Sequence, residues 1–231
     1  MGHMITISAS DGTGAIPTYI AEPVAPARAA IIVMPEIFGV NDGIRSKVDD
    51  WAALGYLATA PDIFWRFAPG VELNPDVPDQ LQQAFGNMQQ YRAEHGVADI
   101  AALLVWNRTQ HIEKTGVVGF CLGGRLAYMA AARTRVDAAV GYYGVMIDTM
   151  LDEAAAITRP LALHIPTADH FVGSDAQAAI HAALDHHSQV TLWDYPGLDH
   201  GFAASTGARR NKAAAILADQ RTRDFFAAHL A

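Results

Sequence analysis

The stretch Gly119-Phe120-Cys121-Leu122-Gly123 surrounds the only cysteine of the chain. The apolar run 115–118 before it predicts a buried strand, and the run 124–131 after it predicts a helix. A sharp turn between a strand and a helix, with glycine two positions before and after the central residue, is typical of a nucleophile elbow. The helix N-terminus favours thiolate, so we interpret Cys121 as the nucleophile. The alternative is a small buried apolar residue, which is the usual role of a free cysteine.

Strands and helices alternate along the rest of the chain. Two short strands at 5–9 and 17–21, joined by a turn at Asp11-Gly12, predict a hairpin. Strands are then expected at 29–34, 56–60, 115–118, 137–143, 160–165 and 189–195, and helices at 42–55, 79–91, 97–109, 124–131, 149–156, 175–187 and 209–230. This order predicts an α/β fold with a mostly parallel central sheet and helices on both faces.

Length and composition narrow the class of protein. The 231 residues are 51% hydrophobic, which is enough for one domain, expected over 4–231 with 1–3 as an expression remnant. A formal net charge of −8 argues against nucleic-acid binding. One cysteine excludes an internal disulfide and a cysteine-based metal cluster, and we expect no cofactor. No apolar run reaches the roughly 20 residues of a membrane span, and no signal peptide is recognised, so a cytoplasmic location is expected. Oligomeric state stays open.

A nucleophile needs a base, and the base needs an orienting partner. The strand 160–165 runs into a loop that contains Asp169, and the strand 189–195 runs into a loop that contains His200. In a parallel sheet these loops lie at the same edge as the elbow. The order nucleophile, acid, histidine is that of the α/β-hydrolase fold, so Cys121, Asp169 and His200 are the predicted triad.

Other acids and histidines near these positions are interpreted as structural. Asp199 adjoins His200, but neighbouring side chains diverge in an extended loop, so a solvent-facing or loop-bracing role is expected. His170 and His164 are expected to be structural too. The histidines at 186–187 follow a helix end, where a cation is favoured, and no spacing typical of a zinc site is found.

The loop after the strand 29–34 reads Met34-Pro-Glu-Ile-Phe-Gly-Val-Asn41. In this fold that loop supplies one backbone N–H to the oxyanion hole, and the residue after the nucleophile supplies the other. Position alone therefore selects Ile37 and Leu122 as donors. Glu36 follows a strongly apolar strand and is expected to point into the site, where a carboxylate near the thiol would take its proton or stay neutral. The alternative is an exposed loop carboxylate.

The segments MPEIFGVN, GFCLGG, GYYG, TADHFV and DHGF, in this order and spacing, resemble the dienelactone hydrolase family, the carboxymethylenebutenolidases. The resemblance covers essentially the whole chain. It implies the triad Cys121, Asp169 and His200, with Glu36 as the carboxylate that hydrogen-bonds the thiol. It also implies a resting thiol that is mostly neutral and becomes thiolate when substrate rearranges the cysteine and the glutamate.

The chain departs from the family where substrate is bound. Members that act on dienelactone hold its carboxylate with two arginines, expected within 79–85 and just past His200, and neither stretch has one. Arg209 and Arg210 come later and are expected only to begin the last helix. A guanidinium is the natural partner of a carboxylate, so a more apolar, uncharged ester or lactone is expected. The expected pocket residues, which could equally be core, are Phe38, Trp65, Phe67, Phe85 and Tyr143.

The predicted activity is therefore hydrolysis of a small ester or lactone through a thioester on Cys121. Two alternatives stay open. Class I glutamine amidotransferases share G-x-C-x-G, but Arg125 stands where they carry glutamine, and no His-x-Glu pair follows. A non-catalytic binding protein of the same fold would use Cys121 only to line a pocket.

Overall fold

The computed structural model describes residues 2–205 and 207–231, and its centre is an eight-stranded sheet. The strand order is β1-β2-β4-β3-β5-β6-β7-β8. β1 and β2 form the expected antiparallel hairpin, β2 is also antiparallel to β4, and all other pairs are parallel. The strands span His3–Ser8, Ala15–Ala21, Ala30–Met34, Leu57–Pro61, Thr115–Phe120, Ala138–Tyr142, Leu161–Pro166 and Val190–Tyr195.

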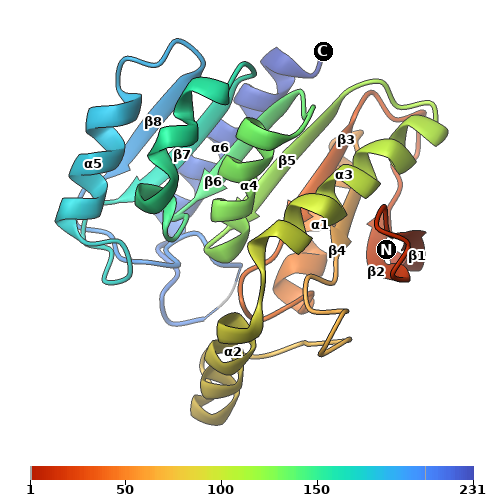
Figure 1. The fold of residues 1–231 in the computed structure, drawn as a ribbon, viewed down its shortest axis with the longest axis horizontal. Helices are drawn as coiled ribbons and strands as arrows, with labels where there is room; N and C mark the ends of the chain where they lie inside the picture. The colour runs from red at the N-terminus through yellow and green to blue at the C-terminus, as the bar shows by residue number, and fades with distance from the viewer. Residues whose placement is uncertain (1, 206) are drawn as a thin grey trace.

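Helices cover both faces of this sheet (Figure 1). One face carries α1 (Asp42–Ala53) and α6 (Lys212–His229), whose rings Trp51 and Phe226 meet edge to face at 5.5 Å. The other face carries α3 (Ala93–Thr109), α4 (Leu122–Arg133), the 3-10 segment η1 (Ile147–Ala156) and α5 (Ser174–Leu184). α2 (Pro78–Gln90) projects beyond one edge of the sheet. The predicted α/β-hydrolase architecture is thus confirmed.

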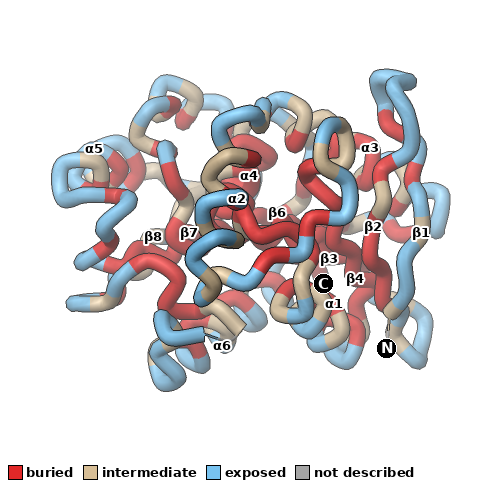
Figure 2. Tube along the Cα trace, turned by 90° about the horizontal axis from the view of Figure 1, so that it is seen from below, coloured by how far each residue is buried: buried red, intermediate tan, exposed pale blue. Residues whose placement is uncertain are grey.

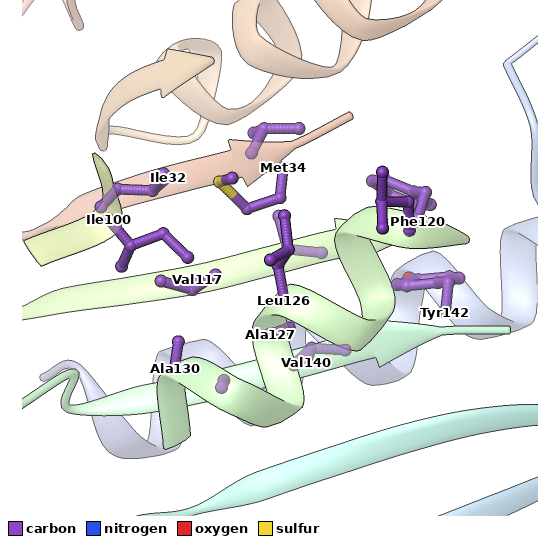
Figure 3. Close-up of a cluster of buried hydrophobic side chains, with 14 of the residues drawn as sticks. Ile32, Met34, Ile100, Val117, Phe120, Leu126, Ala127, Ala130, Val140 and Tyr142 are labelled. Carbon is purple, nitrogen blue, oxygen red and sulfur yellow. The ribbon is translucent and has the colours of Figure 1, made fainter. Parts of the chain in front are cut away.

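The central strands are buried on both faces because helices pack on each side. All residues of β3, β4, β5, β6 and β7 are buried, as the mainly apolar sequences of these strands predict. Figure 2 shows these buried stretches enclosed by exposed loops and outer helix faces. Leu126, Ala127 and Ala130 of α4 lie in one buried cluster with Val117 of β5 and Val140 of β6 (Figure 3). The elbow therefore lies between a fully buried strand and a helix with a buried inner face.

β3 lies between β4 and β5 in the sheet. The chain passes from β3 to β4 on one side, and after α2 and α3 it continues in β5 on the other side of β3. Loops that leave β3 and β5 therefore diverge at the carboxyl edge, which is where parallel α/β sheets bind ligands. The loop of Glu36 follows β3, and Cys121 follows β5.

Several predicted boundaries differ from the structure: α3, for example, begins at Ala93 rather than 97, and α5 ends at Leu184 rather than 187. Three other differences bear on the chain ends and on η1. His3, within the segment expected as an expression remnant, begins β1 and pairs with Ile20. The predicted helix 149–156 is 3-10 in type and is kinked at Met150, where φ is −139°. The last helix begins at Lys212 rather than 209, because the Asn211 side chain caps it by accepting the N–H of Ala214. None of the helices in the described ranges is long and apolar enough to span a membrane.

Candidate active site

Cys121 occupies a strained turn between β5 and α4. Its φ of 55° and ψ of −113° lie where a residue with a side chain is rarely found. A Cβ on Gly119 would overlap the Gly123 carbonyl, and one on Gly123 would overlap the Met34 carbonyl. Both obstacles are backbone, which cannot move aside, so the two glycines are sterically required. The turn places the sulfur at the N-terminus of α4.

The acid and the histidine meet as the sequence predicts. Asp169 Oδ2 and His200 Nδ1 are 2.8 Å apart, and both side chains are buried. The other oxygen, Oδ1, accepts the N–H groups of Phe171 at 2.8 Å and Val172 at 3.1 Å. These bonds fix the carboxylate plane, so the imidazole is held with Nε2 free. Within the described residues that Nε2 is buried and has no hydrogen-bond partner.

The electrostatics of His200 tie it to the cysteine. Burial disfavours the imidazolium and lowers its pKa, but the negative charge of Cys121 and the bond to Asp169 outweigh burial and raise the pKa of His200 to about 10. Cys121 and His200 also line one cavity of about 410 Å³. The structure therefore brings the three predicted residues together at one cavity.

Glu36 lies in the same cavity as Cys121 and is partly buried. Burial raises its pKa, while the charges of His200 and Lys47 oppose that rise. Among the described residues no hydrogen bond joins Glu36 to the thiol. The role that the family resemblance implies for Glu36 at the thiol therefore stays a prediction.

The two predicted oxyanion donors lie where the fold places such groups. Leu122 is the first residue of α4, and Ile37 is buried in the loop after β3. Neither N–H donates a hydrogen bond within the described part of the chain, so both are free to bind an oxyanion. Ile37 lines the cavity beside Cys121.

The predicted pocket residues divide into two groups. Phe38 and Phe85 line the cavity. Trp65 does not, which corrects that expectation: its indole N–H donates to Asp99 at 3.1 Å, beside the Arg66–Asp99 ion pair. Phe67 is exposed and packs on Phe64 instead.

Tyr143 also lies outside this cavity and supports the histidine from behind. Its ring is buried and lies 4.9 Å from that of His200 and 5.8 Å from that of Phe202. Burial and the charges of Glu36 and Cys121 raise its pKa well above the usual value, so its hydroxyl stays neutral. Tyr143 therefore packs against His200, and its contact with substrate stays a prediction.

Arg209 is a cavity residue that the sequence pattern assigned to the wrong place. It lies before the first turn of α6 rather than within it, and it lines the cavity together with Glu36, Cys121 and His200. Its side chain is exposed, and its charge opposes the raised pKa of Glu36. No sequence signal distinguishes this position from a helix start, because only the cap at Asn211 decides where α6 begins.

Four apolar lining residues were also missed. They are Leu81 and Met88 of α2, Val145 after β6, and Phe171 beside Asp169. Leu81, Phe85 and Met88 recur at helical spacing on one face of α2, which is a readable signal. The rings of Phe85 and Phe171 lie 6.1 Å apart, so α2 and the acid loop meet over the cavity.

Lys47 of α1 touches two of the segments that carry site residues. Its Nζ donates to the Ala203 carbonyl, three residues past His200, at 3.2 Å. It also lies 4.4 Å from the centre of the Phe120 ring, next to Cys121. Burial lowers the pKa of Lys47, while the charges of Asp219 and Glu36 oppose the shift. A lone lysine in a helix gives no sequence signal of such contacts.

One group of potential metal ligands occurs in the described residues, formed by Asp169, His170 and Asp199. These side chains are already hydrogen-bonded: Asp169 binds His200, and Asp199 binds His170 at 2.7 Å. The three side chains therefore have a structural role in the two loops that carry the acid and the base.

Comparison with known proteins gives the family. The family model "Dienelactone hydrolase family" matches residues 16–230. A putative carboxymethylenebutenolidase of Azospirillum brasilense is 40% identical over 228 residues, 98% of each chain. The carboxymethylenebutenolidase of Pseudomonas putida is 36% identical and covers 96% of this chain and 95% of its own.

The solved structures agree. A putative dienelactone hydrolase from Klebsiella pneumoniae subsp. pneumoniae MGH 78578 superposes with a TM-score of 0.86, at 25% identity and 98% coverage of each chain. A promiscuous phosphotriesterase like dienelactone hydrolase, P91 from metagenomic libraries, shares the fold at a TM-score of 0.76 and 18% identity, covering 99% of this chain and 98% of its own. The chain belongs to the dienelactone hydrolase family of carboxylic ester hydrolases.

Proposed function

We propose that this protein hydrolyses a small ester or lactone through a thioester on Cys121. One observation carries the proposal. His200 is held by Asp169 at 2.8 Å, shares a cavity with Cys121, and has its pKa raised to about 10, against the effect of burial, by the charge of the cysteine and the bond to Asp169. A base oriented in this way against a thiol is the arrangement that nucleophilic acyl transfer requires.

The reaction begins from thiolate and imidazolium. The sulfur attacks the ester carbonyl carbon, and the N–H groups of Ile37 and Leu122 stabilise the oxyanion. Loss of one such donor typically costs about 10²–10³ in rate. The C–O bond then breaks, and His200 gives its proton to the departing oxygen. In a lactone that oxygen stays attached to the acyl group.

Hydrolysis of the thioester restores the enzyme. Neutral His200 takes a proton from water, and the hydroxide attacks the thioester carbonyl. The C–S bond breaks, which releases the carboxylic acid and returns Cys121 to thiolate beside imidazolium. Asp169 keeps Nδ1 of the imidazole protonated, so that Nε2 is the atom that exchanges protons.

The lining of the cavity supports an apolar acyl or leaving group. Eleven residues line the cavity. Besides Ile37, the apolar ones are Phe38, Leu81, Phe85, Met88, Val145 and Phe171. The two arginines that hold a carboxylate in dienelactone-cleaving members are absent, and Arg209, the one arginine in the lining, is exposed to solvent. We therefore propose an uncharged ester or lactone as the preferred substrate.

The decisive experiment combines Cys121→Ala with intact-mass measurement during turnover of p-nitrophenyl acetate. The wild type should gain the mass of one acetyl group and release nitrophenol, whereas Cys121→Ala should do neither. Full esterase activity in the alanine variant would refute the thioester. Stoichiometric alkylation of Cys121 without any ester turnover would favour the binding-protein alternative.

Substrate preference is tested separately, by ranking kcat/KM for matched uncharged and carboxylate-bearing esters and lactones. The uncharged compounds should rank higher. The opposite ranking, if abolished by Arg209→Gln, would show that this arginine replaces the missing pair.

A further inference from the structure

The acid and the base of the triad both stand on loops. Asp169 lies between β7 and α5, and His200 lies between β8 and α6. Each loop leaves a strand at the sheet edge, where parallel pairing of β7 and β8 ends at Pro166 and Tyr195. The 2.8 Å bond between Asp169 and His200 therefore depends on contacts that hold one loop against the other.

A single carboxylate oxygen joins these loops beside both triad residues. Oδ1 of Asp199 accepts the backbone N–H of His200 at 2.6 Å. It also accepts the backbone N–H of His170 at 3.0 Å and meets Nδ1 of the His170 ring at 2.7 Å. His170 directly follows Asp169, so the carboxylate fixes the residue after the acid and the backbone of the base together.

The other bonds between the loops lie nearer the strands. Ala168 donates its N–H to the Leu198 carbonyl at 2.9 Å, and Gly197 donates to the hydroxyl of Thr167 at 2.9 Å. These set the distance between the loops at their base. The Ala168 bond also adjoins Asp169, but only Asp199 binds the residue that follows Asp169 and the backbone of His200 together.

The Asp199 carboxylate is charged near neutral pH. Partial burial opposes ionisation, but the His170 side chain and the N–H groups of His200 and His170 lower the pKa of Asp199 to about 2. Hydrogen bonds to a charged acceptor are stronger than bonds between neutral groups. Asp199 therefore accepts these bonds as a carboxylate near neutral pH.

We propose that Asp199 is a positioning residue, which holds the loop of Asp169 against the loop of His200 and so sets the orientation of the imidazole. It does not line the cavity that contains Cys121, so it acts through these two residues and does not touch substrate. This rests on the proposed function, because the orientation of His200 affects the rate only if His200 is the catalytic base.

A matched pair elsewhere in the chain provides the control. His181 of α5 lies 2.8 Å from Asp185 and 3.1 Å from Asp194 of β8, with all three side chains at least partly exposed. Asp194 therefore joins two elements through a histidine as Asp199 does, but it contacts no triad residue among those described. Exposed pairs of this kind add little to stability, so Asp199→Ala and Asp194→Ala should have similar melting temperatures.

The two variants should differ in catalysis. Misplacing a catalytic group by about 1 Å costs on the order of 10²-fold, so Asp199→Ala should lower kcat for p-nitrophenyl acetate by about 10- to 100-fold with KM little changed. Asp194→Ala should keep wild-type kcat. Asp199→Asn retains an acceptor oxygen and should recover part of the loss, and His170→Phe, which leaves both backbone bonds, should lose less than Asp199→Ala.

A proton NMR signal separates positioning from general stability. The Nδ1 proton shared by His200 and Asp169 should resonate far downfield in the wild type and in Asp194→Ala, and should shift or broaden in Asp199→Ala. A folded Asp199→Ala with wild-type kcat and an unchanged signal would overturn the proposal. If that variant does not fold, wild-type kcat and signal in both Asp199→Asn and His170→Phe would overturn it.

The signal also separates this proposal from the proposed function. It can be measured in Cys121→Ala, which performs no thioester chemistry. If Cys121→Ala retained esterase activity while Asp199→Ala still disturbed the resonance, the thioester mechanism would fail and the brace would stand. If Cys121→Ala were inactive while Asp199→Ala left the resonance undisturbed, the thioester mechanism would stand and the brace would fail.

Discussion

The two halves of the candidate site are held by different means. The nucleophile half, formed by the ends of β3 and β5, is fixed by backbone: a strained Cys121, flanking glycines that admit no Cβ, and strands buried on both faces. The acid–base half, formed by the ends of β7 and β8, is fixed by side-chain hydrogen bonds between two loops. The backbone of the first half therefore cannot be changed at its glycines without disturbing the fold, while the second half can be loosened with the fold intact.

Among substitutions that compare the two halves, Asp169→Asn should have the largest effect on kcat. An amide at this position would favour the wrong imidazole tautomer, and by analogy with serine-protease triads kcat should fall by about 10³–10⁴-fold. The melting temperature should change little relative to that loss, because the loops are braced by other bonds. Steady-state kinetics with thermal unfolding checks both. A variant with near-normal kcat would remove Asp169 from the triad.

Gly123→Ala should destabilise the folded protein at the Cys121 turn. The added Cβ would overlap the Met34 carbonyl, which belongs to a buried strand. Overpacking of this kind should lower the free energy of unfolding by about 3 kcal/mol. Gly86→Ala in α2 is the control: its Cβ meets open space, and replacing a helical glycine should raise stability by about 0.5–1 kcal/mol. Urea denaturation measures both; equal stabilities would contradict the steric account.

The buried His164 beneath the acid–base half should make stability depend on pH. Burial, with the charge of Arg221, lowers its pKa well below the usual value, and its nitrogens bond Tyr195 and Thr222. As the pH falls, His164 is protonated in the unfolded chain before it is protonated in the folded protein. The free energy of unfolding therefore decreases as the pH falls below about 6.5. Between pH 8 and pH 5 the wild type should lose about 2 kcal/mol more than His164→Gln, measured by urea unfolding. Parallel pH curves for the two proteins would disprove this.

Lys47→Met should produce the smallest effect, because it weakens one link between the halves. The charge of Lys47 opposes the raised pKa of Glu36, so its removal should raise that pKa further. Because Glu36 is predicted to act on the thiol as a carboxylate, the acid limb of the pH profile of kcat/KM should then move to higher pH. Lys47→Arg, which keeps the charge, should resemble the wild type. A shift of the limb to lower pH would show that Glu36 does not control it.

Much of the fold could be predicted because buried parallel strands and covering helices leave strong patterns. The apolar runs of β3 and β5 predicted a central position, and the hairpin at Asp11-Gly12 was correct. The wrong predictions lie at the ends of elements. The start of α6 was misplaced by three residues, because Arg209 and Lys212 are equally compatible with a helix and the Asn211 cap decides between them.

The elbow could be predicted from local sequence, since a strand, two glycines and a helix constrain the backbone around Cys121. The sequence also located Asp169 and His200, because the carboxyl ends of parallel strands must share an edge. Other contacts follow from long-range packing: Trp65 binds Asp99, and Arg209 reaches the cavity. In the same way, Lys47 and Asp199 contact the loop of His200. Local patterns specify neighbours along the chain, whereas these contacts depend on how loops and helices far apart in sequence pack against one another.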